Sequence, residues 1–449
     1  MPDNSRLKIA VIGTGISGLS AAWLLSQRHD VTIYEQAGRL GGHSNTVIAE
    51  VNGRTIPVDT GFIVFNRVTY PNLTALFEHL KVPTQVSDMS FAASLHEGGF
   101  EYSGADLAGL IAQRRNLVRP RFWSMLSDLR RFYRNAVRDA SAPGFERLTL
   151  GEYLHAGGYG KAFRDYHLLP MGCAIWSSTP EDMLGVSALA FIRFHANHGL
   201  LQIAERPVWE TVTGGSIAYV TRLAESFAGR VKLNTAAVRV RRSDEGVRVW
   251  DSKGAAEPFD HVVISAHADQ ALAMLADPSA PERELLGAIR YRRNLAVLHS
   301  DASLMPKRRS VWASWNYVGG DPQGGDAHFT YWMNRLQAIP DETPLFVTLN
   351  PRRRVQPGTL HHSENYDHPI LDARAITAQQ RLWELQGARR TWFCGAYFGS
   401  GFHEDGLQAG LAVAEQLGGV RRPWRVADES GRIVVGTPRV LEAARESAA

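Results

Sequence analysis

Short apolar runs alternate with stretches of helical periodicity at the beginning of this chain and again in its second half. Ile9–Ile12, Val31–Tyr34 and His261–Ser265 are apolar runs of the kind that buried parallel strands use. The run from Leu19 to Ser26, between the first two, is typical of a helix. Strands that alternate with helices in this way predict an α/β fold built on a parallel sheet.

The segments between these runs show other patterns. Val47–Val51 and Thr55–Val58 flank an Asn-Gly turn, which predicts a β-hairpin. Helical periodicity predominates in residues 106–138 and 149–205, whereas strands and aromatic residues predominate in 290–385. These segments predict a second domain of the α+β class with a helical part.

A glycine motif follows the first apolar run. Gly13, Gly15 and Gly18 have G-x-G-x-x-G spacing between a strand and a helix, and Glu35 stands at the end of the second strand. In this context the three glycines permit a tight turn, close approach of a pyrophosphate, and close packing of helix on strand. The helix N-terminus offers unpaired N–H groups to the phosphates, and Glu35 can accept hydrogen bonds from ribose hydroxyls. The sequence therefore predicts a dinucleotide site.

The patterns also predict how the chain divides into domains. We assign residues 1–88, 209–289 and 388–420 to one discontinuous dinucleotide-binding domain. Residues 89–208 and 290–387 form a substrate domain. Residues 421–449 are a polar C-terminal tail, for which we expect loose packing or the role of a surface arm.

Composition and charge restrict the class of protein. The chain has 449 residues, of which 44% are hydrophobic and 21% are charged, as in globular proteins. No apolar run reaches the roughly 18 residues of a membrane-spanning helix, and the first strand begins too early for a signal peptide. Two cysteines, Cys173 and Cys394, cannot form a disulfide framework, so we expect a cytoplasmic protein. A net charge of only +4 does not favour nucleic-acid binding.

The helical stretch at residues 106–138 carries a cluster of positive charge. Hydrophobic and aromatic residues recur along it at spacings near three and four. A basic amphipathic helix either lies on an anionic membrane surface or presents a solvated face of the substrate domain. The sequence leaves both interpretations open. The arginines of this stretch are Arg114, Arg115, Arg119, Arg121, Arg130, Arg131, Arg134 and Arg138.

The sequence shows little sign of a metal centre. His195 and His198 lie three residues apart on one predicted helix, but no cysteine or carboxylate partner accompanies them. We therefore predict that they are core or surface histidines and that the protein holds no metal. The chain also lacks a nucleophile elbow, a Walker loop and a CxxC pair.

The residues after Glu35 extend the glycine motif. Arg39, Gly41 and Gly42 complete an E-x-x-x-R-x-G-G pattern. This pattern resembles the extended dinucleotide motif of FAD enzymes in the amine oxidase and phytoene desaturase superfamily. Residues 209–275 and 391–417 are similar to the second part and the last βα unit of the FAD domain in that superfamily. The resemblance implies FAD as cofactor, a Rossmann-like, discontinuous FAD-binding domain, and an amine-oxidase-like fold.

The resemblance also implies which residues contact the cofactor. Asp59–Phe62 matches a D-x-G segment near the flavin, and Val238 matches a valine with backbone contacts to the adenine. The last helix, expected to begin at about Asp405, matches one whose positive N-terminal end stabilises charge on the flavin. The implied cofactor-binding residues are Gly13, Gly15, Ile16, Ser17, Gly18, Glu35, Gln36, Arg39, Gly41, Gly42, His43, Thr60, Gly61, Phe62, Val238, Ala266, Gly395, Gly406 and Leu407.

Several positions depart from the pattern of the superfamily. The lysine that amine oxidases carry near flavin N5 falls, by eye, at Asn294, and their aromatic cage is replaced at Phe402 and His403. Ala396 stands where an acidic residue is common. We predict His403 and Glu404 as an acid or base beside the flavin, because histidine transfers protons near pH 7, and Asn294 as a third catalytic residue.

A narrower resemblance involves two further segments. Ser310–Tyr317 and Gly401–Gly406 resemble a bacterial group of predicted FAD-binding, amine-oxidase-like proteins. That group is associated with cyclopropane-fatty-acid-synthase-like methyltransferases and with modified, methylated or furan, fatty acids. The resemblance implies a lipid-like substrate and a methyltransferase partner in the same pathway. We hypothesise an oxidoreductase that moves a hydride from an unsaturated or methyl-branched acyl chain to flavin N5.

Other functions remain open at this point. The enzyme could be a fatty acid double-bond isomerase, which returns the hydride, or an amine or carotenoid-type oxidase. The fold of the superfamily also serves as a prenyl-protein chaperone without flavin, so a non-redox lipid-binding module is a further alternative. The partners we expect are a lipid or other apolar small molecule and an anionic membrane surface, on whose inner face a cytoplasmic enzyme would lie peripherally.

Overall fold

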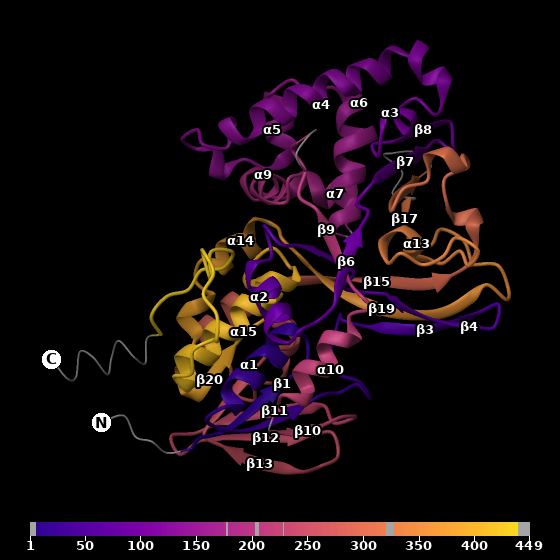
Figure 1. Ribbon diagram of the computed structural model, residues 1–449. Helices are drawn as coiled ribbons and strands as arrows, with labels where there is room; N and C mark the ends of the chain where they lie inside the picture. Colours follow the sequence, from indigo (N-terminus) through magenta and orange to yellow (C-terminus); the bar gives the residue numbers. More distant parts are fainter. Residues whose placement is uncertain (1–5, 177, 203–205, 228, 320–326, 439–449) are drawn as a thin grey trace.

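A five-stranded parallel sheet with the order β10-β2-β1-β14-β20 lies at one end of the molecule (Figure 1). The computed structural model describes residues 6–176, 178–202, 206–227, 229–319 and 327–438. The predicted apolar runs are strands of this sheet, and its central residues are fully buried. The α/β fold class is confirmed. The five strands are β1 (Lys8–Ile12), β2 (Asp30–Tyr34), β10 (Arg230–Lys232), β14 (His261–Ile264) and β20 (Thr391–Phe393).

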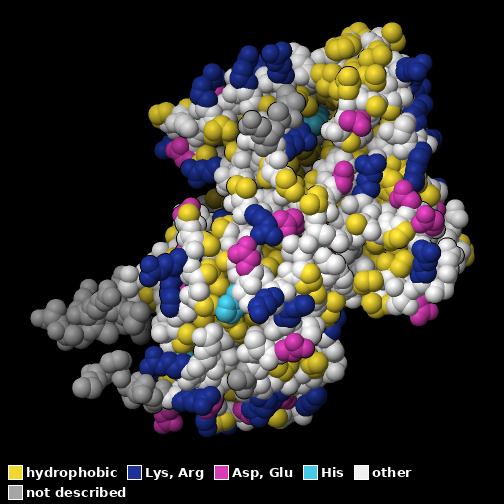
Figure 2. All heavy atoms as spheres, in the orientation of Figure 1, with side chains coloured by type: hydrophobic (Ala, Val, Ile, Leu, Met, Phe, Trp, Pro, Cys, Tyr) yellow, Lys and Arg dark blue, Asp and Glu magenta, His cyan; other side chains and the backbone are white. Residues whose placement is uncertain are grey.

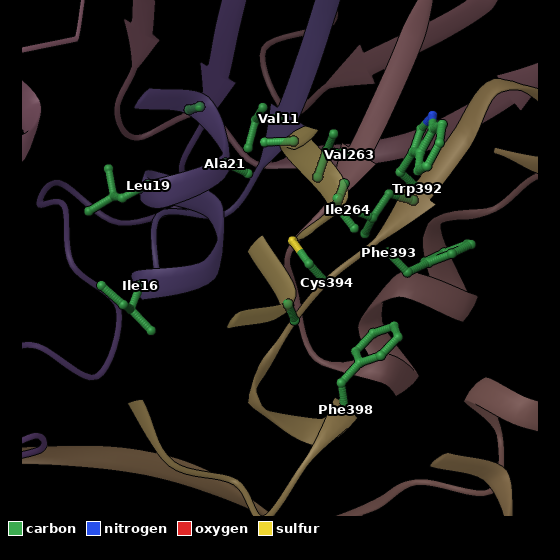
Figure 3. Packing of buried hydrophobic residues seen from close by; sticks show 14 of the residues in the cluster. Val11, Ile16, Leu19, Ala21, Val263, Ile264, Trp392, Phe393, Cys394 and Phe398 are labelled. Atoms are coloured by element: carbon green, nitrogen blue, oxygen red, sulfur yellow. The ribbon is translucent and has the colours of Figure 1, made fainter. Parts of the chain in front are cut away.

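Helices α1 (Ile16–Ser26) and α15 (His403–Gly418) pack against each other over this sheet. Small residues allow the close approach, since a Cβ added at Gly410 would lie 2.2 Å from the carbonyl oxygen of Ser17. Figure 3 shows the core beside them, where side chains from α1 meet those of β1, β14 and β20. Because Gly406 also adjoins Ile16, the N-terminal ends of both helices meet at one edge of the sheet.

A seven-stranded sheet with the order β19-β15-β18-β17-β16-β7-β8 forms the centre of the second part of the molecule. Two of its strands come from residues 89–208 and five from 290–387, although the domain boundaries themselves stay a prediction. The strands are β7 (Phe91–Leu95), β8 (Phe100–Ser103), β15 (Arg290–His299), β16 (Trp315–Gly319), β17 (Ala327–Trp332), β18 (Phe346–Leu349) and β19 (Leu360–Ile370).

Helices cover the end of the molecule opposite the parallel sheet (Figure 1). The helical pattern predicted for residues 106–138 is confirmed, but it is divided, because a 3₁₀ turn at Arg114–Val118 interrupts it and Pro120 begins a new helix. Among the described residues, no helix combines the length and apolar character needed to cross a bilayer. These helices are α3 (Leu107–Leu110), α4 (Pro120–Asp139), α5 (Leu150–Ala156), α6 (Lys161–Phe163), α7 (Leu169–Trp176), α8 (Pro180–Gly185) and α9 (Ala188–Asn197).

Smaller elements connect the two parts. The predicted hairpin is confirmed, and a three-stranded sheet with the order β5-β9-β6 and another with the order β11-β12-β13 accompany it. The strands are β3 (Thr46–Val51), β4 (Arg54–Asp59), β5 (Val64–Asn66), β6 (Thr84–Ser87), β9 (Trp209–Val212), β11 (Ala237–Arg242), β12 (Val247–Asp251) and β13 (Ala256–Phe259). The helices are α2 (Pro71–His79), α10 (Ile217–Glu225), α11 (Ala268–Met274), α12 (Ala280–Leu286), α13 (Met333–Leu336) and α14 (Ala373–Gln379).

The beginning of the C-terminal tail is packed on the α/β part. Arg432 Nε pairs with the fully buried carboxylate of Asp405 at 2.7 Å. Trp424 stacks on Trp23 of α1, with ring centroids 5.9 Å apart. The prediction of a loose surface arm is therefore wrong for residues 421–438, since an ion pair and an aromatic stack hold them, whereas residues 439–449 lie outside the described residues.

Candidate active site

The glycine loop has the geometry of a phosphate-binding turn. Gly13 adopts a φ of +98°, which L side chains rarely adopt, and a Cβ on Gly18 would lie 2.1 Å from the Gly13 carbonyl oxygen. A Cβ on Gly15, in contrast, would meet nothing within 4 Å. The open space at Gly15, next to the N-terminus of α1, fits a bound pyrophosphate.

Glu35 organises the loop from the end of β2. Its carboxylate accepts hydrogen bonds from the backbone N–H groups of Thr14, at 3.0 Å, and Ala37, at 2.8 Å. Arg39 Nη1 donates to the carbonyl oxygen of Gly42 at 2.8 Å, which holds the Gly41–Gly42 turn. A carboxylate has further lone pairs for ribose hydroxyls, and that contact stays a prediction, as does any contact of the exposed Gln36.

Val238 occupies an irregular position on β11. The register pairs Ala237 with Asp251 and Arg239 with Trp250, so the strand ladder skips Val238. Its side chain is exposed. The turn before β11 is joined to the end of β2, because the Thr235 N–H donates a hydrogen bond of 2.8 Å to the Glu35 carbonyl oxygen. A residue that bulges from its ladder has a backbone free for other partners, which fits the implied contact with adenine.

Several of the other predicted cofactor residues converge at the carboxyl ends of the parallel strands. Ser17 at the start of α1 is hydrogen-bonded to Ser265 after β14, with 2.9 Å between hydroxyl oxygens, and Ala266 follows directly. A Cβ on Gly406 would lie 3.5 Å from the backbone nitrogen of Ala396, which follows Gly395. Ligands of doubly wound sheets bind at this edge, and two helix N-termini here favour negative charge.

His403 stands at the first turn of α15, in a network with the cofactor loops. Its ring stacks on Phe62 with centroids 3.7 Å apart. Its Nε2 lies 2.8 Å from the Ser44 hydroxyl and 3.2 Å from the Tyr219 hydroxyl. Burial lowers the pKa of His403 to about 3, so the ring is neutral near pH 7. The preceding residue, Phe402, stacks instead on Phe194 of α9, at 4.8 Å.

Glu404 has a different environment from the one predicted. Its carboxylate accepts hydrogen bonds from the backbone N–H groups of Asn72, at 3.1 Å, and Leu73, at 2.9 Å, at the start of α2. The amide of Gln408 donates to it as well, at 2.9 Å. The fully buried carboxylate therefore caps a helix, and this position does not agree with an acid or base beside the flavin. We assign Glu404 a structural role instead.

Three histidines from distant segments gather beside the Gly41–Gly42 turn. The ring of His43 lies 6.1 Å from that of His267 and 5.5 Å from that of His368, and Tyr366 adjoins it at 4.9 Å. Within the described residues, the buried Nε2 of His43 has no hydrogen-bond partner. Burial, as the main cause, lowers the pKa of His43 well below its usual value. It also lowers the pKa of His368 to about 4. The cluster is therefore uncharged at neutral pH.

Asn294 belongs to this cluster through His368. Its side chain is fully buried on β15, and its Nδ2 lies 3.0 Å from His368 Nδ1 on β19. Its Oδ1 accepts a hydrogen bond of 2.7 Å from Asn350 Nδ2, and Asn350 Oδ1 accepts one of 3.0 Å from Leu295 N–H. Asn294, which we predicted to lie near the flavin, is thus hydrogen-bonded to His368, a residue that the sequence analysis did not single out.

An apolar cavity adjoins the histidine cluster. It is partly open to solvent, and His368 is among its lining residues. The ion pair of Arg292 with Asp182 also lies on its wall. Hydrophobic side chains from α7, α8, α9, the end of β19 and α14 form most of the lining, among them Trp176, Met183, Phe191, Ile370, Leu371 and Ile376.

His195 and His198, which have metal-ligand spacing in the sequence, are core residues. The Nδ1 of each bonds to the carbonyl oxygen four residues earlier, at 2.8 Å, in Phe191 and Phe194. Each ring also stacks on the same phenylalanine at 3.9 Å. Across the part of the chain that the structure describes, no three histidine, cysteine, aspartate or glutamate side chains form a group that could hold a metal ion.

Known structures share this fold. A fatty acid isomerase from P. acnes that produces CLA superposes with a TM-score of 0.65 and 16% identity, over 91% of this chain and 98% of the isomerase. Cyclohexylamine oxidase from Brevibacterium oxydans IH-35A superposes with a TM-score of 0.64 and 16% identity, over 92% of this chain and 100% of the oxidase. At this level of identity the similarity establishes the fold alone.

The sequence also matches a family profile over most of its length. The family is described as flavin containing amine oxidoreductase, and the match covers residues 16–300. The open space at Gly15 and the two helix N-termini fit FAD at this edge of the sheet. The chain is therefore a member of the flavin-containing amine oxidoreductase family and an FAD-dependent oxidoreductase.

Proposed function

We propose that this oxidoreductase acts on a lipid-like substrate, an unsaturated or methyl-branched fatty acyl chain, which binds in the cavity beside His368. The observation that carries the proposal is the hydrophobic lining of that cavity, which includes Trp176, Phe191 and Ile370. Each methylene that leaves water for such a lining contributes about 0.8 kcal/mol to binding. The one carboxylate on the wall, Asp182, is already paired with Arg292, which disfavours a cationic amine.

A hydrogen-bond relay supports a defined tautomer for His368. Because Leu295 N–H donates to Asn350 Oδ1, the amide of Asn350 must present its NH₂ group to Asn294 Oδ1. Asn294 then presents its own NH₂ group to His368 Nδ1, which must carry a lone pair. The neutral ring therefore has its proton on Nε2 and can donate a hydrogen bond from that atom. We propose that Asn294 is a positioning residue, which acts through His368.

FAD, when bound, supplies the acceptor for a hydride from a substrate carbon. Loss of a hydride leaves a positive centre on the acyl chain, and a proton on the neighbouring carbon becomes strongly acidic. A weak base is sufficient to accept that proton. We propose that His43 accepts it at Nε2, which is buried and unpartnered among the described residues. The hydrophobic lining of the cavity offers water few hydrogen-bond partners near the positive centre.

Anaerobic mixing of the purified, flavin-loaded protein with fatty acids, phospholipids and a panel of amines tests the proposal. Loss of the oxidised-flavin absorbance with an unsaturated or methyl-branched lipid, and not with amines, is the expected result. Bleaching by an amine alone would contradict it. An unchanged flavin band with a displaced double bond in the recovered lipid would instead identify a double-bond isomerase, a function that the structural similarity to a fatty acid isomerase makes worth testing.

Substitutions in the cavity distinguish an effect on lipid binding from an effect on flavin binding. Ile376→Asp places a charge on the lining, and we expect at least a tenfold rise in KM for lipid with unchanged flavin content. Thr377→Asp, on the exposed side of the same helix, is the matched control and leaves KM unchanged. Equal effects of the two substitutions would show that the cavity does not bind the substrate.

A further inference from the structure

Several large hydrophobic side chains are exposed together at the helical end of the molecule. They lie on α3, on the 3₁₀ turn that follows it, and on the first turn of α4. Figure 2 shows hydrophobic side chains gathered at the upper right, where Figure 1 draws α3. We call this group the apolar tip. Its members and their exposed fractions are Leu107 (72%), Ile111 (36%), Leu117 (37%), Val118 (84%) and Trp123 (54%).

The apolar tip is held in this arrangement by hydrogen bonds. Trp123 Nε1 donates to the carbonyl oxygen of Leu117 at 2.8 Å, and the side chain stays exposed. Arg115 and Arg119 both donate to the carbonyl oxygen of Gly99, in the turn between β7 and β8, at 2.7 and 2.8 Å. The 3₁₀ turn is thereby fixed to the sheet, and its hydrophobic side chains point outward.

Positive charge surrounds the tip. Residues 106–138 contain eight arginines and two acidic residues, Asp106 and Asp128. Arg114, Arg121, Arg130 and Arg134 are exposed. Figure 2 also shows Lys and Arg side chains on both sides of the hydrophobic group. Each arginine close to an anionic bilayer contributes about 1 kcal/mol, and long arginine side chains can reach headgroups while apolar neighbours enter the acyl boundary.

A second copy of the chain does not fit this surface. Pairing two tips would bring the arginines of both copies together, and like charges in contact are unfavourable.

The α4 helix is strongly amphipathic, with Phe122, Met125 and Phe132 buried and the exposed Trp123 beside them. An exposed tryptophan among arginines suits the interface of a bilayer, where an amphipathic ring has both an apolar and a polar neighbour.

We propose that the apolar tip docks the protein on the surface of an anionic phospholipid bilayer. The tip enters the headgroup region, and the exposed arginines of α4 and the 3₁₀ turn contact the phosphates. The proposal stands on exposure and charge and does not depend on the substrate of the enzyme. Of the two alternatives that the sequence left open for residues 106–138, it favours the membrane surface.

Co-sedimentation of the flavin-loaded full chain with phosphatidylcholine vesicles, with and without phosphatidylglycerol, tests the proposal. We expect binding to vesicles that contain phosphatidylglycerol and at least tenfold weaker binding without it or at high salt. Val118→Asp combined with Trp123→Ser should weaken binding about tenfold or more, because two apolar anchors are lost.

The control is Val68→Asp, which charges a valine of similar exposure, 76%, away from the tip. We expect this variant to bind as the wild type does, and flavin content shows that each variant is folded. Binding that is equal for all variants, or equal for both vesicle types, would overturn the proposal. A wild-type dimer in sedimentation velocity that the tip variant loses would also overturn it and assign the surface to self-association.

Discussion

The cofactor half of the active site and the half that we propose for the substrate are formed by different parts of the chain. The cofactor half is backbone, where Gly15 leaves open space and Gly18 lies against the carbonyl of its own turn. The substrate half consists of side chains, since Asn294, His368 and Trp176 come from β15, β19 and α7. The first depends on a short local sequence, and the second depends on the pairing of β15 with β19, which brings Asn294 and His368 together across 74 residues.

This difference explains how one fold can serve different substrates. A phosphate cradle made of backbone tolerates little variation, whereas cavity side chains can change without altering the sheet. A fatty acid isomerase and a cyclohexylamine oxidase share the fold of this chain at 16% identity each. Substitutions in the cofactor half should therefore change folding and flavin binding, whereas substitutions in the substrate half should change turnover.

The largest effect is expected in the glycine loop. Gly18→Ala forces a Cβ to 2.1 Å from a backbone oxygen, so we expect loss of flavin and a lower free energy of unfolding. Gly15→Ala has room for its Cβ and should fold normally, but with at least tenfold weaker FAD binding. Flavin content and denaturant titration separate the two variants. Gly185→Ala, where a Cβ also meets nothing within 4 Å, is the control. Normal FAD affinity in Gly15→Ala would place the pyrophosphate elsewhere.

A large effect on turnover is expected at His368. Because its Nε2–H is the proposed donor, His368→Ala should lower kcat about 100-fold with unchanged flavin content. His368→Gln retains an N–H group and should recover part of that loss. Single-turnover kinetics with lipid measure both. An equal loss in the two variants would mean that the ring contributes shape and not a hydrogen bond.

A smaller, more specific effect is expected at Asn294. Asn294→Asp presents a carboxylate to His368 Nδ1, which then carries the proton, and its negative charge raises the pKa of His368 above the present value of about 4. We expect kcat to fall about tenfold and the acid limb of the pH–rate profile to move to higher pH. Asn294→Ala removes the relay without adding charge. If both variants lose activity but neither moves the limb, Asn294 has a packing role only.

Glu404 should affect stability and not chemistry. Glu404→Gln turns an acceptor of two backbone N–H groups into a side chain with an NH₂ group facing donors. We expect a loss of about 1–3 kcal/mol in the free energy of unfolding, with turnover per bound flavin unchanged. Urea titration and activity assays on the same preparation measure both. A variant with normal stability and reduced turnover would restore the acid or base role.

Acid should lower the free energy of unfolding gradually, through three buried histidines of the helical part. Burial lowers the pKa of His167 and His198 to about 3 and that of His195 to about 4, below the value near 6.5 of the unfolded chain. Below pH 6.5 the unfolded state therefore binds more protons, and stability falls by about 1.4 kcal/mol per pH unit for each such histidine. Urea midpoints between pH 7 and 5 test this. A midpoint that does not change with pH would contradict it.

The same contrast decides what the sequence could predict. The fold class, the strands of the parallel sheet and the hairpin were predictable, because apolar runs and the glycine spacing encode them locally. The cluster of His43 with His267 and His368 was not, since it depends on the pairing of β15 with β19. Glu404 was misassigned because its partner helix, α2, is more than 300 residues away in the sequence. The break before Pro120 was readable from the proline itself.

The strand order has a consequence for how the protein is made. The cradle is encoded in residues 8–42, yet β1 pairs with β14, and β14 pairs with β20 at residues 391–393. During translation the phosphate loop is therefore synthesised early, whereas β20 and α15, which complete its surroundings, are synthesised last. Insertion of the flavin is then a late event of biosynthesis, and chains whose translation stops before residue 391 cannot sequester the cofactor.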